Sequence, residues 1–125
     1  MPEIETRLTA TELELMTILW EIKEGSVRDI MGQLPADRQL AYTSVSTIVR
    51  ILEKKNFVLA RKEGRGHVYY PAIKKSEYEK FSVSDLIENV FDGTPTSLVR
   101  CLIEDDKLSK SDIDQLKKLI EGMDS

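Results

Sequence analysis

The segment from Ala41 to Ala72 constrains the fold of this chain more than any other, because it joins an amphipathic helix directly to a basic hairpin. A helix is predicted from about Thr43 to Lys55. At 100° per residue its apolar residues fall on one side, namely Val45, Ile48, Val49 and Leu52. Asn56 suits a left-handed helix end, and two strand-like runs, Phe57–Lys62 and His67–Ala72, flank a Gly-Arg-Gly turn. This order is typical of a winged helix-turn-helix, in which the helix enters the DNA major groove.

The outer side of the same helix carries hydroxyl and cationic groups. The residues that we expect to contact DNA there are Tyr42, Thr43, Ser44, Ser46, Thr47, Arg50 and Lys54. Arg50 can donate two hydrogen bonds to guanine, and the hydroxyls can meet bases or phosphates. Tyr42 and Ser44, near the helix N-terminus, are placed for phosphate. The alternative is a merely solvated face, but Glu53 is its single acid, which favours DNA contact.

The hairpin is predicted to be a cationic wing formed by Arg61, Lys62, Arg65 and His67. Its tip would reach the DNA backbone or the minor groove. A charged edge that prevents strand pairing is the alternative, and both roles can hold. His67 is the only histidine, so a strand or phosphate contact is favoured over catalysis or metal binding.

The charge is divided between two parts of the chain, although the whole protein carries a net charge of -4. From Arg38 to Lys75 nine bases face two acids, whereas from Ser76 to Ser125 six bases face twelve acids. The basic part suits a polyanion, and a polyanion would repel the acidic part. The alternative is that both sets of charges only solvate the surface.

Two further helices are predicted before the amphipathic one. Thr9 and Glu12 form a capping box, after which Leu13, Met16, Leu19 and Trp20 repeat at helical spacing. Leu8 and Leu13 are placed to form a hydrophobic staple. The second helix begins at Ser26, with Asp29 three positions later, and Pro35 stops it. Residues 1–75 are therefore predicted to form a winged-helix DNA-binding domain.

Three short amphipathic helices are predicted in residues 76–125. They total about 40 residues, too few for an independent core. They either fold back on the first domain or pair with a second copy, and pairing fits a DNA-binding dimer better. The residues expected in this dimerisation region are Val83, Leu86, Val90, Leu98, Leu102, Leu116 and Ile120. The predicted fold class is thus mainly α with a small β wing.

Other functions lack a signal in this sequence. No nucleotide-binding loop, catalytic motif or paired acids with a plausible pocket is present, so an enzyme is not expected, and neither a cofactor nor a metal is implied. The polar N-terminus does not resemble a secretory signal, and no apolar run reaches about 18 residues, so we expect a cytoplasmic protein without membrane insertion. Cys101 is expected to be a buried, inert thiol, with a redox sensor as the alternative.

The chain resembles the penicillinase-repressor family of bacterial transcriptional repressors, the BlaI/MecI/CopY group. The resemblance covers nearly the whole chain, and its strength comes from the order and spacing of several motifs. These are LTATELELMTILWE, SVRDIMGQLP, LAYTSVSTIVRILEKKNFV, GRGHVYYPA and GTPTSLVRCLIEDDKLSKSDIDQLKKLI.

The resemblance implies a homodimer that blocks transcription from a palindromic DNA operator of beta-lactam-resistance or other stress genes. It implies that Tyr42, Thr43, Ser44, Ser46, Thr47 and Arg50 belong to the recognition helix. In the beta-lactam members a membrane sensor-protease cuts an Asn-Phe bond in the tail, and the matching pair here is Cys101-Leu102. The copper-responsive members carry a C-terminal cysteine cluster that this chain lacks, so metal-triggered release of that kind is not expected.

A second function class is a winged-helix module that binds protein without specific DNA readout. It predicts no steep dependence of DNA binding on salt concentration, whereas a repressor that contacts phosphates predicts one.

Overall fold

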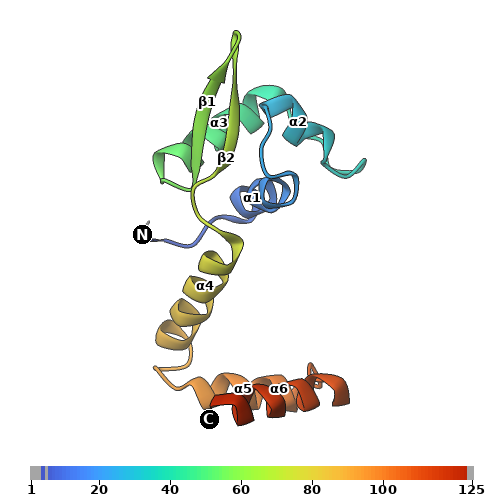
Figure 1. Cartoon of the computed structure of the whole chain (residues 1–125), viewed down its shortest axis with the longest axis vertical. Coiled ribbons are helices and arrows are strands. Elements are labelled where there is room, and N and C mark those ends of the chain that lie inside the picture. The colour runs from blue at the N-terminus through green and yellow to red at the C-terminus, as the bar shows by residue number, and fades with distance from the viewer. Residues whose placement is uncertain (1–3, 5, 124–125) are drawn as a thin grey trace. The chain divides into compact units, whose positions relative to one another are not determined.

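The computed structural model describes residue 4 and residues 6–123, and the chain divides into two compact units, Met1–Ser82 and Val83–Ser125 (Figure 1). The elements of the first unit are α1 (Ala10–Ile22), α2 (Val27–Gly32), α3 (Tyr42–Lys54), β1 (Val58–Glu63) and β2 (Gly66–Pro71). Helix α4 (Lys75–Asn89) begins in the first unit and ends in the second, which also holds α5 (Pro95–Glu104) and α6 (Lys110–Met123).

Over the described residues, no helix has both the length and the apolarity needed to cross a membrane. Whether residues 1–75 fold alone stays a prediction.

The predicted capping boxes at the starts of α1 and α2 are present. The Thr9 hydroxyl accepts a hydrogen bond from the backbone N–H of Glu12, whose carboxylate accepts one from the backbone N–H of Thr9. Ser26 and Asp29 make the same reciprocal pair at the start of α2. These bonds satisfy amides that the helix itself leaves unpaired, and they fix where both helices begin.

The predicted inner face of α1 is partly wrong. Leu13 is 37% exposed, whereas Leu15 and Ile18 join Met16 and Leu19 in the core. The predicted apolar residues and the residues that are in fact buried both recur at helical spacing. The pattern alone therefore does not fix the rotation of the helix about its axis. The structure buries the side that also carries Glu12.

Helix α3 packs its predicted apolar stripe inward. Val45, Val49 and Leu52 are fully buried, and Ile48 packs partly against the same core. Asn56, at φ 66°, adopts the predicted left-handed conformation. It turns the chain so that the Phe57 amide donates to the Leu52 carbonyl oxygen and β1 begins at once.

Strands β1 and β2 form an antiparallel hairpin with Val58 opposite Pro71 and Lys62 opposite His67 (Figure 1). Gly25, between α1 and α2, adds a bridge to Tyr69 through two backbone hydrogen bonds of 2.9 and 2.8 Å. A side chain at Gly25 would approach Asp29 and Ile22 to 2.9 Å, so the close approach favours glycine. Tyr69 is buried and Tyr70 only half-buried, as expected for residues on alternate faces of a strand.

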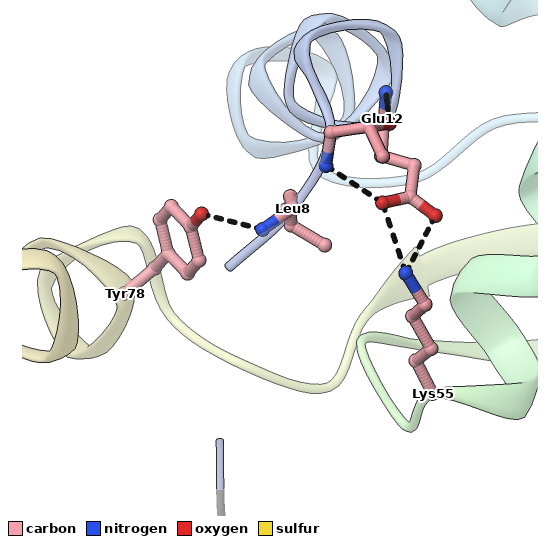
Figure 2. A network of polar contacts seen from close by, with 5 residues as sticks. Leu8, Glu12, Lys55 and Tyr78 are labelled. Atoms are coloured by element: carbon pink, nitrogen blue, oxygen red, sulfur yellow. Dashed lines mark hydrogen bonds and ion pairs between the residues drawn. The ribbon is translucent and has the colours of Figure 1, made fainter. Parts of the chain in front are cut away.

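An aromatic cluster anchors the start of α4 to the first unit. The ring of Tyr78 lies 5.8 to 6.1 Å from the rings of Trp20, Phe57 and Phe81. Its hydroxyl oxygen accepts a hydrogen bond of 2.8 Å from the backbone N–H of Leu8 (Figure 2). The first turns of α4 are therefore held by packing and by a specific polar contact.

The second unit has no buried side chain among its described residues, 83–123. Its helices expose many large apolar residues, namely Val83, Val90, Val99, Ile103, Ile113, Leu116, Leu119, Ile120 and Met123. Leu86, Leu98 and Leu102 are half-buried.

The prediction that Cys101 is a buried thiol is wrong, because Cys101 is exposed on α5. It precedes the half-buried Leu102 and lies on the solvent side of that helix.

Candidate nucleic-acid interface

The outer face of α3 is open to solvent along its length. Tyr42, Thr43, Ser44, Thr47, Arg50 and Lys54 are exposed, and Ser46 is half-buried. The Thr47 hydroxyl donates a 2.8 Å hydrogen bond to the Thr43 carbonyl oxygen. The hydroxyl is therefore committed as a donor, which leaves its oxygen lone pairs and the threonine methyl group for a partner.

The N-terminus of α3 differs from those of α1 and α2. Its cap residue is Ala41, and no side chain of the described residues caps the helix there. The first amides of a helix have no partner within it, and they carry the positive end of the helix dipole. Tyr42 and Ser44 stand beside these amides, so this end of α3 suits a phosphate group.

One cleft separates α3 from the wing. It has a volume of about 640 Å³, and Arg50 and Lys54 line one side of it while Lys62 and His67 line the other. Glu53 is the only acid in this lining. Lys62 and His67 are direct partners across the hairpin, so they share a face and both point to the α3 side with the buried Tyr69.

A second cleft, of about 420 Å³, lies between α3, the start of α2 and the wing. Tyr42, Ser46, Arg50, Arg65 and His67 line it, as do Arg28 and Glu63. Arg50 and His67 therefore border both clefts. The structure brings together predicted residues from the helix and the wing on one cationic surface.

Sequence reasoning missed Arg28. Its guanidinium lies 5.1 Å from the centre of the Tyr42 ring, in the range of a cation–π contact. The residue is exposed in the first turn of α2, where a helix-turn-helix crosses the DNA backbone. A basic residue two positions after the Ser26 cap was the available signal in the sequence.

Arg61 lies on the opposite face of the hairpin from Lys62 and His67, because successive strand residues alternate. Its guanidinium is 2.7 Å from a Glu24 carboxylate oxygen and 3.1 Å from one of Glu63. The hydrogen bonds that Arg61 donates to these two carboxylates raise the pKa of its guanidinium above the ordinary value, and the bond to Glu24 contributes most. The structure therefore does not bring Arg61 together with the other predicted DNA-binding residues.

The described residues contain no cluster of three His, Cys, Asp or Glu side chains that could hold a metal ion. The surface can supply hydrogen bonds and positive charge, both suited to a polyanion.

Comparison with known proteins identifies the family. The model of the family described as penicillinase repressor matches residues 8–122. The penicillinase repressor of Bacillus licheniformis is 27% identical over 115 residues, which cover 92% of this chain and 90% of that protein. The methicillin resistance regulatory protein MecI of Mammaliicoccus sciuri is 26% identical over 113 residues, covering 90% and 92% of the two chains.

A solved structure shares the fold of the N-terminal part. The solution structure of monomeric Bacillus licheniformis BlaI in complex with the blaP half-operator is 28% identical and gives a TM-score of 0.51. The match covers 62% of this chain and 94% of that one. The predicted fold class, helical with a two-stranded wing, is confirmed. The chain belongs to the penicillinase repressor family of DNA-binding transcriptional repressors, and it is not an enzyme.

Proposed function

We propose that this protein binds a palindromic operator as a homodimer and represses the genes beside it. The observation that carries the proposal is the outer face of α3, exposed over its whole length and bordered by two clefts that share Arg50 and His67. The width of the major groove admits one helix, and Arg50 projects from the middle of α3. A solved complex of a family relative with a half-operator supports this use of the fold.

Each group on this surface has a distinct part in the proposal. Arg50 and Thr47 read base edges, with Thr43 and Ser46 beside them. The amides at the start of α3, with Tyr42 and Ser44, hold a phosphate. Arg28, Lys54, Lys62, Arg65 and His67 contact the backbone on either side of the groove. Arg61 contributes only if DNA phosphate displaces Glu24 and Glu63, because both acids already neutralise it.

The second unit supplies the dimer contact. Its described residues bury no side chain of their own, and many large apolar side chains in this unit remain exposed to solvent. A second copy of the chain would remove these faces from water and place two recognition helices on one duplex. The exposed residues Val83, Val90, Leu116 and Ile120 and the half-buried residues Leu86, Leu98 and Leu102 form this interface.

Release from DNA follows when the dimer is broken. The Cys101-Leu102 bond lies inside α5, with an exposed cysteine and a half-buried leucine. A cut there, by a membrane sensor-protease of the kind that the resemblance implies, would divide the dimer contact. It would leave α1 to α3 and the wing intact. The protein would act in the cytoplasm, where the operator and the cut both lie.

The salt dependence of binding separates a repressor from a protein-interaction module. We expect the affinity of the full-length dimer for its genomic footprint sequence to fall by about 10³ to 10⁵ between 50 and 200 mM salt if six to ten phosphates are contacted. A scrambled duplex of equal length should bind more weakly at every salt concentration. A flat salt response together with equal affinity for the scrambled duplex would refute the proposal and favour the interaction module.

A further inference from the structure

A cleft of about 960 Å³ lies where β2 ends and α4 begins. Trp20 and Ile73 contribute to its apolar wall, and Lys23, Lys74, Lys75 and Lys80 surround it. It lies at the Val58–Pro71 end of the hairpin, whereas Arg65 and the turn are at the other end. None of the residues that line it belongs to the two clefts beside α3.

The lysines give this cleft an unbalanced positive charge. None of the four ammonium groups makes an ion pair or a hydrogen bond with any residue that the structure describes. Glu77 is the only acid in the lining. Its carboxylate already accepts a 2.9 Å hydrogen bond from the backbone N–H of Lys74. The charge of the cleft is therefore left for a ligand or for solvent to balance.

The apolar wall is held in place by a hydrogen bond and by aromatic packing. The Trp20 indole N–H donates a 2.9 Å hydrogen bond to the Ile73 carbonyl oxygen, and its ring packs 6.0 Å from the ring of Tyr78. Ile73 is buried, and Trp20 is half-buried, so part of the indole remains accessible. A flat apolar group can pack against such a surface without any rearrangement of it.

The backbone at Lys23 adds a further observation. Lys23 ends α1 at φ 73°, in a region that favours glycine. Gly25 stands only two residues later, yet the strained position is occupied by a lysine that lines the cleft. Strained residues of this kind tend to occur at binding sites.

We propose that this cleft binds a small organic anion that has a flat apolar body and a doubly charged phosphate or dicarboxylate end. Its volume lies within the range of small-molecule sites, about 300 to 1,000 Å³. The apolar body packs on Trp20, while the charged end lies among Lys74, Lys75 and Lys80, and Lys23 adds a further positive charge to the lining. Ammonium groups bind such oxyanions as point charges. The site is separate from the DNA-binding face and does not depend on the proposed operator.

Phenyl phosphate is the probe, because it joins a flat ring to a dianion. Trp20 is the only tryptophan, so the full-length protein labelled with ¹⁵N gives one indole N–H signal in its NMR spectrum. We expect phenyl phosphate to shift this signal saturably, with a Kd at least tenfold lower than that of inorganic phosphate or of phenol. Equal Kd values for phenyl phosphate and inorganic phosphate, or a shift that does not saturate, would overturn the proposal.

Matched substitutions locate the charged end. Lys74→Gln and Lys80→Gln should each raise the Kd for phenyl phosphate at least threefold. Lys117→Gln and Lys118→Gln, in the exposed α6, remove the same charge from the same protein and should leave the Kd unchanged. An equal effect of all four variants would mean that only overall charge matters and would overturn the proposal. Displacement of phenyl phosphate by random-sequence duplex would likewise overturn it, because the lysines would then be a DNA-backbone contact.

Discussion

Lys55 Nζ lies 2.9 and 3.0 Å from the two carboxylate oxygens of Glu12, joining the end of α3 to the start of α1 (Figure 2). Glu12 is only 5% exposed, and the same carboxylate also caps α1 by accepting from the Thr9 backbone N–H. Lys55 remains about one third exposed. One acid thus caps the beginning of α1 and ties the C-terminal end of α3 to it.

Loss of this pair should destabilise the first unit without changing the proposed DNA-binding surface. We expect Lys55→Ala to lower the free energy of unfolding by about 1–3 kcal/mol, because it leaves an almost buried carboxylate without its cation. Lys54→Ala, one residue earlier and exposed, should change the free energy of unfolding by less than about 0.5 kcal/mol. Urea denaturation of both variants measures the difference, and equal midpoints would contradict this role of Lys55.

The stability contributed by Glu12 should depend on pH. Burial raises the pKa of Glu12, but hydrogen bonds from Thr9 and Lys55 outweigh it, so its pKa is lowered from the ordinary 4.5. A carboxyl whose folded pKa is depressed contributes its stability above the unfolded pKa, and loses it as the pH falls through the folded pKa. Acid titration of the wild type should therefore show a loss of stability below about pH 4.5 that is smaller in Glu12→Gln. Parallel pH profiles would contradict the assignment.

The assignment of base readout to Arg50 predicts a change in sequence preference as well as in affinity. Arg50→Ala should weaken operator binding by about 1–3 kcal/mol and relax the preference at one base pair of each half-site. Lys118→Ala, which removes an exposed cation from α6, is the matched control. Selection of bound sequences from a random pool reads out the preference, and an unchanged consensus for Arg50→Ala would exclude base contact by this residue.

Thr47 offers a test of which part of its side chain is used. Its hydroxyl hydrogen is already donated to the Thr43 carbonyl oxygen, so we expect the methyl group to meet a thymine. Thr47→Val keeps the branched shape and should retain most of the sequence preference, whereas Thr47→Ala should lose it at a cost of about 1–3 kcal/mol. Equal losses in the two variants, measured by anisotropy with thymine and uracil duplexes, would assign the contact to the hydroxyl oxygen.

The wing should act through phosphate. Arg65→Ala is expected to weaken specific and scrambled duplexes alike and to reduce the slope of log affinity against log salt by about one. Arg61→Ala should change that slope less, because Glu24 and Glu63 already hold its guanidinium on the other face of the hairpin. A larger change of slope for Arg61→Ala than for Arg65→Ala would show that DNA displaces these acids.

Local sequence patterns predict much of this fold. The two capping boxes, the left-handed Asn56 and the strand-turn-strand run each depend on residues within a few positions of one another, and all three are present. The family resemblance then added the operator and the dimer. Most of the proposed DNA-facing surface was also predictable, since one face of α3 carries the larger part of it.

Contacts between distant segments were not predictable. The Glu12–Lys55 pair spans 43 positions, and the face of Arg61 depends on strand register and on Glu24 from another segment. The contact between Arg28 and the Tyr42 ring joins two helices, and no local pattern predicts it. Two rotations of α1 about its axis are compatible with the spacing of its apolar residues. The exposure of Cys101 could not be predicted because α5 buries none of its side chains.

The tail is expected to determine the oligomeric state. Leu102→Asp places a charge on the apolar side of α5 and should convert the dimer to a monomer, because burial of an unpaired carboxylate is costly. Arg100→Asp puts the same acid at an exposed position of that helix and should leave a dimer. Sedimentation velocity distinguishes the two states. Intact far-ultraviolet dichroism would show that the first unit remains folded in the Leu102→Asp protein.

Binding of the full-length protein to a full palindrome and to its isolated half-site tests the central claim most directly. Because the dimer tethers the second recognition helix, we expect the palindrome to bind at least 100-fold more tightly than the half-site at equal salt. Changing the spacing between half-sites by five base pairs should abolish that advantage, since it turns the second site to the opposite side of the duplex. Equal affinity for the palindrome, the half-site and the respaced duplex would contradict a dimeric, sequence-specific repressor.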